Sequence, residues 1–142
     1  MKTSNIELIK RHEGIKLASY QDVGGVWTIG YGHTKHVRQG DTITESQAEW
    51  YLYQDVKEVE DFLNGHGLTL TQCQFDALVS FGFNVGIGNL SKSTLFRKLK
   101  NDPFDWTIYC EFCRWIKAGG QAYKGLLRRR IAEANHYFND VL

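Results

Sequence analysis

Residues 13–34 read EGIKLASYQDVGGVWTIGYGHT and hold two carboxylates nine positions apart, Glu13 and Asp22. The pattern predicts a short helix that ends at Glu13, and Asp22 precedes a glycine pair that predicts a turn. Thr28 follows in a segment of alternating character. Two carboxylates held by a helix end and a hairpin are the groups that glycoside hydrolysis uses, one as acid and the other as base or nucleophile. Singly, each carboxylate is equally typical of a solvated surface, so the prediction depends on the whole string.

The alternation predicts a β-hairpin, and the length of its loop decides which side chains share a face. A two-residue loop at the glycine pair would place Asp22 opposite Trp27 and turn Thr28 to the other face. Asp22 and Thr28 can hold one water between them only if they lie opposite each other, which requires an odd loop centred on Gly25. We therefore expect a loop of three or five residues, most simply residues 24–26 with a bulge.

Length and composition describe an ordinary globular chain. Its 142 residues suit one domain, with 42% apolar and 23% charged residues. No apolar run approaches the roughly 20 residues that span a bilayer, and the first ten residues lack the apolar core of a signal peptide. We expect no membrane insertion and a protein that is made and kept in a cytoplasm.

The three cysteines form an odd set, which predicts reduced thiols in such a compartment. Cys110 and Cys113 have the spacing of half a zinc site, but no second cysteine or histidine pair completes four ligands. We expect both to be buried in a helix, and we expect no metal.

The net charge of +1 is too balanced for a general nucleic-acid binder, yet it is unevenly distributed. Residues 1–80 carry 7 basic and 11 acidic groups, whereas residues 81–142 carry 10 and 5. Lys124 and residues 128–130, three consecutive arginines, concentrate the positive charge. This pattern favours a solvated helix face with one arginine turned inward as a structural ion pair, and attraction of an anionic polymer is the alternative.

Capping signals divide the rest of the chain into helices. A hydroxyl followed three residues later by Glu or Gln satisfies the free amides at a helix start. The signature occurs at Ser4 with Glu7, at Thr44 with Gln47 and at Thr71 with Gln74, and Asp102 with Pro103 predicts a fourth start.

The predicted fold class is α+β and mainly α, in a single domain over residues 1–142. A small N-terminal lobe of about residues 1–45 holds the hairpin, and a long helix over about residues 45–63 joins it to a helical C-terminal lobe of about residues 66–142. Two groups of glycines, Gly86 with Gly88 and Gly119 with Gly120, separate the later helices. Strands are expected only in the first third of the chain.

The string resembles the catalytic signature of phage endolysins of the T4-lysozyme type, the muramidases of glycoside hydrolase family 24, especially the lambdoid branch. The similarity continues in order and spacing through ITESQAE (43–49), LTQCQFDALVSFGFNVG (70–86), STL (93–95), RWIKAGG (114–120) and KGLLRRRIAE (124–133). The resemblance implies a lysozyme-like, two-lobed fold.

The resemblance implies a role for each residue of the string. Glu13 is the general acid that protonates the glycosidic oxygen, Asp22 is the second carboxylate that supports the attacking water, and Thr28 helps to hold that water. The family is regarded as inverting, which implies carboxyl groups roughly 6.5–9.5 Å apart. To act as an acid, Glu13 needs partial desolvation, and Arg128 or Arg129 is its expected partner.

Five further residues are assigned by resemblance to support or substrate binding. His33 is expected to pair with Asp55 on the connecting helix, a scaffolding role that fades outside the pH window in which both are charged. A catalytic role for His33 is the alternative. Thr34, Phe83 and Thr94 fall where family members line the saccharide cleft, although core packing or helix capping explains each equally well.

The resulting hypothesis is an endolysin, an N-acetylmuramidase that hydrolyses the β-1,4 bond between N-acetylmuramic acid and N-acetylglucosamine in peptidoglycan. We expect no cofactor, no nucleic-acid partner and a monomer, with holin-dependent release from the host cytoplasm to the cell wall. A lytic transglycosylase is the alternative enzyme, but it would use one acid and would not need Asp22 and Thr28. A non-catalytic peptidoglycan-binding module would need neither carboxylate.

Overall fold

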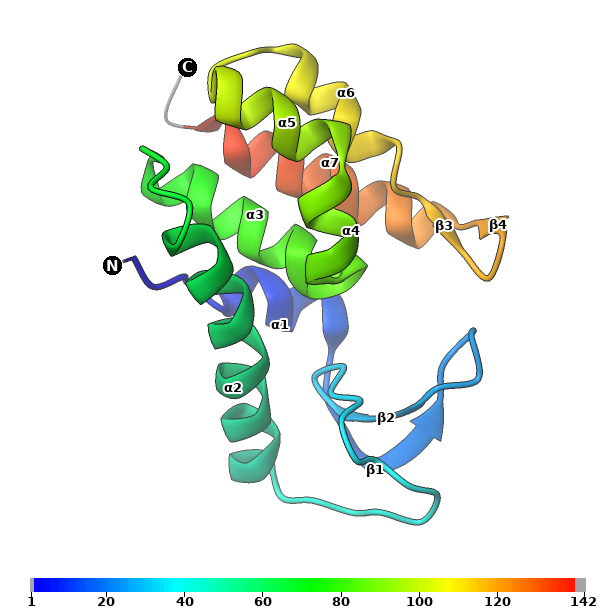
Figure 1. Ribbon diagram of the computed structural model, residues 1–142. Helices are drawn as coiled ribbons and strands as arrows, with labels where there is room; N and C mark the ends of the chain where they lie inside the picture. The colour runs from blue at the N-terminus through cyan, green and yellow to red at the C-terminus, as the bar shows by residue number, and fades with distance from the viewer. Residues whose placement is uncertain (1, 140–142) are drawn as a thin grey trace.

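The computed structural model describes residues 2–139 and shows a mainly helical chain with two small hairpins (Figure 1). Its elements in chain order are α1 (Glu7–Glu13), β1 (Lys16–Gln21), β2 (Trp27–Gly30), α2 (Glu45–Asn64), α3 (Gln72–Val85), α4 (Ile87–Lys92), α5 (Thr94–Asn101), α6 (Thr107–Cys113), β3 (Lys117–Ala118), β4 (Gln121–Ala122) and α7 (Lys124–Tyr137). The predicted α+β, mainly α class is confirmed.

The elements form a hairpin side and a helical side that α2 connects. Figure 1 shows β1, β2 and the segment after them at one end of α2, and α3 to α7 gathered around its other end. Helix α2 buries Leu52, Val56 and Val59, and its extent agrees with the long helix predicted over about residues 45–63. Across residues 2–139, no helix combines the length and the apolar character needed to cross a bilayer.

The hydrophobic core lies on the helical side and centres on α3. Residues 74–82 of α3 are all buried, and the helix packs against α7 and α2. Such density is expected of the one helix that neighbours surround, because it has no face left for water. Ile6 and Ile9, before and within α1, belong to the same core cluster as Phe75 and Phe81. Helix α1, which ends at Glu13, is therefore anchored to the helical side.

The β1–β2 hairpin has an odd loop, as predicted, but the loop is centred on Gly24 and not on Gly25 as predicted. Gln21 pairs with Trp27, so five residues lie between the strands, and Thr28 pairs with Tyr20. The cause is the side chain of Asp22, whose Oδ1 accepts the N–H groups of Gly24 and Val26 and fixes the turn around residue 24. Asp22 therefore lies opposite Val26, whose carbonyl accepts its N–H at 2.9 Å, and the predicted placement of Asp22 opposite Thr28 is wrong.

The two central capping boxes are confirmed, and each ties a helix start to its own side chain. Thr44 accepts the Gln47 N–H while Gln47 accepts that of Thr44, and Thr71 and Gln74 do the same at α3.

The capping prediction at Ser4 is wrong. Its N–H and hydroxyl both donate to Glu60 on α2, at 2.6 and 2.8 Å, so the side chain serves a tertiary contact. Helix α1 begins at Glu7, whose N–H donates to Asn5 Oδ1.

The predicted helix start at Asp102 and Pro103 is also wrong. Asp102 ends α5, and its Oδ1 accepts the Phe104 N–H within a turn. Helix α6 begins only at Thr107, whose N–H donates to the Asp105 side chain. The side chains of Asp102 and Asp105 both stabilise this turn. The Asp-Pro pair therefore indicated a turn that precedes the helix, and not the helix start itself.

Strands are not confined to the first third of the chain, because β3 and β4 form a second antiparallel hairpin. Each has two residues, too few to show alternation, and the connecting Gly119 and Gly120 have φ of +57° and +82°. The expectation of buried cysteines is also wrong, because Cys110 is exposed on α6 and Cys113 is half-buried there. Within residues 2–139, no group of three or more His, Cys, Asp or Glu is placed to hold a metal ion.

The predicted pair between His33 and Asp55 is confirmed and joins the hairpin side to α2. His33 Nδ1 lies 2.7 Å from Asp55 Oδ2, and the imidazole stacks on Tyr51 with ring centroids 4.2 Å apart. Burial raises the pKa of the Asp55 carboxyl, although the hydrogen bond and charge of His33 act in the opposite direction. The carboxylate is therefore held in a place that favours its neutral form, and its partner limits the cost.

We expect His33→Ala to lower the free energy of unfolding by about 1–3 kcal/mol, because it leaves the half-buried Asp55 without its partner. Asp55→Asn should cost less, since an amide oxygen still accepts a hydrogen bond. Denaturant unfolding at pH 7 measures both. A scaffolding role also requires that folded His33→Ala keep its lytic rate, and a large loss of rate in a folded variant would favour the catalytic alternative.

Candidate active site

Glu13 is the last residue of α1, and the chain turns away immediately after it. Gly14 adopts φ +64° and its N–H donates to the Lys10 carbonyl, which ends the helix. The side chain of Glu13 is 17% exposed, enough to reach solvent and little enough to be shielded by its surroundings. The predicted helix end at this carboxylate is therefore correct.

Arg129 on α7 is the arginine that holds Glu13. Its Nη1 donates to Glu13 Oε1 at 2.6 Å, and its side chain is only 6% exposed. The same guanidinium donates through Nε to Glu133 at 3.2 Å and through Nη2 to the Ser80 carbonyl at 3.3 Å. Arg129 therefore links α1, α3 and α7 at one point, whereas Arg128 is exposed.

Behind Arg129 lies a second, fully buried pair, Arg130 and Glu133. Arg130 Nε is 3.1 Å from Glu133 Oε1, and both side chains are completely buried. Burial lowers the pKa of Arg130 to about 10 and raises that of Glu133. Ser80 and Asn84 on α3 complete the cluster through hydrogen bonds at 2.5 and 2.6 Å. Two arginines and the carboxylates Glu13 and Glu133 thus balance their charges inside the protein.

Glu13 and Asp22 line one cleft of about 690 Å³ between the hairpin side and the helical side. Arg129 lies in its floor, and Trp115 and Tyr123 contribute to the helical wall. Asp22 is exposed at the tip of the β1–β2 hairpin, and both hydrogen bonds that the described residues make to its carboxylate use Oδ1. Its Oδ2 is thus available to a ligand.

Tyr20 lies under the influence of both carboxylates. Burial raises the pKa of its hydroxyl, and the charges of Glu13 and Asp22 raise it further. The phenol is therefore kept protonated, and it lies close enough to both carboxylates to be affected by their charges.

Gly32 makes room for the other oxygen of Glu13. A β-carbon at this position would lie 2.8 Å from Glu13 Oε2, and the backbone has φ +77°. Arg129 binds Oε1, so Oε2 is the oxygen that faces Gly32 and is not held by the arginine. The two oxygens of the candidate acid are therefore distinguished by their surroundings.

His12 lines the cleft beside Glu13 and is held neutral. Burial and the positive charges of Arg129 and Arg130 lower its pKa to about 4. Its Nε2 is buried without a hydrogen-bond partner among the described residues. A neutral imidazole adds no charge to the balanced cluster behind it.

The remaining predicted site residues are distributed around the cleft. Thr28 is buried in β2, where its hydroxyl donates to the Val26 carbonyl at 2.9 Å, and it does not line the cleft itself. Thr34 and Phe83 line an adjoining groove of about 260 Å³ that Gly32 also borders. Thr94 lines a third hollow, which meets the cleft at Trp115 and Lys117.

Comparison with known proteins gives a consistent result. The sequence model of the phage lysozyme family, described as "Phage lysozyme", matches residues 10–133. The endolysin of Acyrthosiphon pisum secondary endosymbiont phage 1 is 42% identical over 131 residues, which cover 89% of each chain. The chain belongs to the phage lysozyme family.

Other relatives extend the comparison. The chain is 42% identical over 134 residues to the endolysin of Bacillus phage B103, but it spans only 51% of that protein's length. The solved muramidase domain of SpmX from Asticaccaulis excentricus superposes with a TM-score of 0.80 at 35% identity, covering 93% of this chain and 92% of that one.

Three contributors to this phage-lysozyme site were not assigned from the sequence, although two had a signal. Tyr20 precedes Asp22 by two residues, and period two places them on one face. His12 is adjacent to Glu13, but its neutrality depends on two arginines that are more than 100 residues away. The close approach of Gly32 to Glu13 joins residues 19 positions apart, and only the fold brings them together.

We expect Gly32→Ala to reduce the lytic rate by about 100-fold, because the added methyl group pushes Oε2 out of place. Gly40→Ala is the matched control, since Gly40 has φ +84° but open space around its Cα. Both variants should lose about 1–2 kcal/mol of stability from backbone strain. Turbidity clearing of permeabilised cells measures the rate, and equal rates for the two variants would contradict the role given to Gly32.

His12 predicts a pH dependence of stability. Its folded pKa of about 4 lies below the ordinary 6.5, so between these values the unfolded chain binds the proton more readily. Stability from this group is complete above pH 6.5 and is lost as the pH falls toward 4. After allowance for solvent screening, wild type should lose about 1–2 kcal/mol more than His12→Gln between pH 7 and pH 4 in denaturant unfolding. Identical pH profiles would refute this account of His12.

Proposed function

We propose that the protein is an endolysin that hydrolyses the β-1,4 bond between N-acetylmuramic acid and N-acetylglucosamine in peptidoglycan. The observation that supports this best is a single cleft lined by two carboxylates in different surroundings. Glu13 is shielded and held by a buried arginine, and Asp22 is exposed at a hairpin tip. Different surroundings allow two carboxyl groups in one site to act as acid and base respectively.

Glu13 acts as the general acid. Arg129 occupies Oε1, so Oε2 is the oxygen that must first take up a proton from solvent and then pass it to the glycosidic oxygen as the bond from C1 to that oxygen breaks. The carboxylate that remains is stabilised by the guanidinium 2.6 Å away. Arg129 thus serves the charged form of Glu13 that appears when the leaving group departs.

Asp22 activates the water that attacks C1 from the opposite face of the sugar. Its Oδ1 is fixed by two backbone N–H groups, which leaves Oδ2 to accept the water's proton as the new C–O bond forms. Thr28 does not line the cleft, and its hydroxyl donates to the Val26 carbonyl, so it supports the turn that carries Asp22. An inverting outcome requires the two carboxyl groups to stand roughly 6.5–9.5 Å apart.

The substrate is a peptidoglycan glycan strand, and the reaction as proposed uses no cofactor. The strand extends from the cleft into the groove of Thr34 and Phe83 on one side and toward Thr94 on the other. We infer a monomer that remains in the host cytoplasm until a holin permits its release to the cell wall. The named muramidase domain of SpmX supports the bond class by similarity.

A lytic transglycosylase is the competing reaction, because it cleaves the same bond with one acid and forms an anhydro-sugar. Asp22 favours hydrolysis, since its exposed carboxylate borders the same cleft as Glu13 and a transglycosylase would give it no task. A non-catalytic binding module would not need two carboxylates that border the same cleft.

We expect Glu13→Gln to slow lysis by about 10²–10⁴-fold, since an amide cannot donate the proton. Asp22→Asn should also be strongly impaired, whereas Glu45→Gln, an exposed carboxylate at the start of α2, should match wild type. Clearing of permeabilised Gram-negative cells gives the rates. Mass spectrometry of the released muropeptides should show hydrated reducing ends, and anhydro ends would indicate a transglycosylase instead.

A further inference from the structure

A second groove, of about 610 Å³, lies outside the catalytic cleft between α2 and the segment over residues 33–43. This segment leaves β2, runs below the β1–β2 hairpin and then crosses to the N-terminal end of α2, as Figure 1 shows. Trp50, Tyr51 and Gln54 of α2 line one wall, and Asp41 and Ile43 line the other. Neither Glu13 nor Asp22 borders it, so the groove has no part in bond cleavage.

Trp50 presents a large apolar ring to solvent in this groove. It is 59% exposed, and its one ring contact is an edge-on approach to Tyr51 with centroids 5.6 Å apart. Trp106 is similarly exposed, at 56%, but stacks on Phe138 with centroids 4.7 Å apart. Tryptophan is usually well buried, so a ring left open in a groove indicates a surface for a ligand.

Polar side chains next to Trp50 match the chemistry of a sugar. Gln54 follows Trp50 by one helical turn and is exposed, and its side chain makes no hydrogen bond within the described residues. An amide offers two donors and an acceptor, which suit the hydroxyl and acetamido groups of an N-acetylhexosamine. The indole in turn offers an apolar face for the C–H side of the ring.

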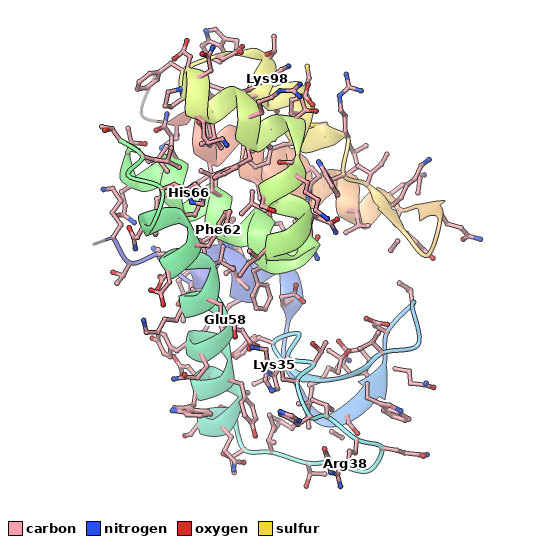
Figure 2. The ribbon with its side chains drawn as sticks, in the orientation of Figure 1. Lys35, Arg38, Glu58, Phe62, His66 and Lys98 are labelled. Carbon is pink, nitrogen blue, oxygen red and sulfur yellow. The ribbon has the colours of Figure 1, made fainter. Side chains whose placement is uncertain are left out.

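The second groove adjoins the one that holds Thr34 and Phe83. Lys35, Asp55 and Glu58 line both. Figure 2 shows Lys35 and Glu58 near each other at the junction of the N-terminal lobe and α2, where they form an ion pair. Both side chains are about half exposed, so solvent screens the pair and little free energy opposes its opening.

We propose that this second groove binds a further stretch of the peptidoglycan glycan strand, with an N-acetylhexosamine ring seated on Trp50 and hydrogen-bonded by Gln54. The proposal rests on the proposed function, because the strand that enters through the groove of Thr34 and Phe83 supplies the ligand. The groove holds the enzyme on its insoluble polymer while Glu13 and Asp22 carry out the cleavage.

Binding to purified peptidoglycan sacculi tests the groove directly. In a Glu13→Gln background, which keeps the polymer intact, we expect Trp50→Ala to weaken binding about tenfold, and Trp50→Phe to restore most of it. Tyr53→Ala is the matched control, because Tyr53 is 54% exposed on the same helix but does not line the groove. Since Trp50 is exposed, the variants should fold, which circular dichroism verifies.

Cleavage rates separate this inference from the proposed function. In the active enzyme, Trp50→Ala should lose more activity on sacculi than on a soluble tetrasaccharide fragment that is too short to reach the groove. Equal sacculus binding by Glu13→Gln with and without Trp50→Ala would contradict glycan binding in the second groove. An equal loss of binding with Tyr53→Ala would contradict it as well. If wild type failed to cleave sacculi, the proposed function would be wrong. The binding comparison would still show whether the second groove binds the glycan strand.

Discussion

The Glu13–Arg129 ion pair is the interaction on which the site depends. It joins the end of α1 to a cluster inside the helical side, where Arg130 and Glu133 are fully buried. Burying four charged groups is costly, and the cost is met only because they are paired and share hydrogen bonds with α3. Removing any one member would leave an uncompensated charge. The candidate acid is therefore also a structural residue, and its position is set by the core rather than by the cleft surface.

This arrangement assigns the two carboxylates to different parts of the molecule. Glu13 belongs to the helical side, since Ile9 of the same helix packs into the core. Asp22 belongs to a hairpin tip whose turn its own side chain fixes. The distance between the two carboxylates then depends on how the hairpin is seated against α2, to which the His33–Asp55 pair joins it.

Much of the fold followed from local signals. The caps at Thr44 and Thr71, the hairpin and its odd loop, and the connecting helix depend on short-range chemistry that the sequence displays. What escaped prediction required tertiary information. Arg128 and Arg129 differ by one residue, and only the rotation of α7 against α3 decides which turns inward. The Asp22 side chain moved the loop centre, and two-residue strands are too short to carry a period.

A double-mutant cycle on Glu13→Gln and Arg129→Gln, measured by the free energy of unfolding, tests the central claim most directly. We expect a coupling of about 1–3 kcal/mol, because each change alone removes the opposite charge from a shielded partner. Additive effects, with a coupling within about 0.3 kcal/mol of zero, would show that the acid and the buried cluster are independent and would contradict the account.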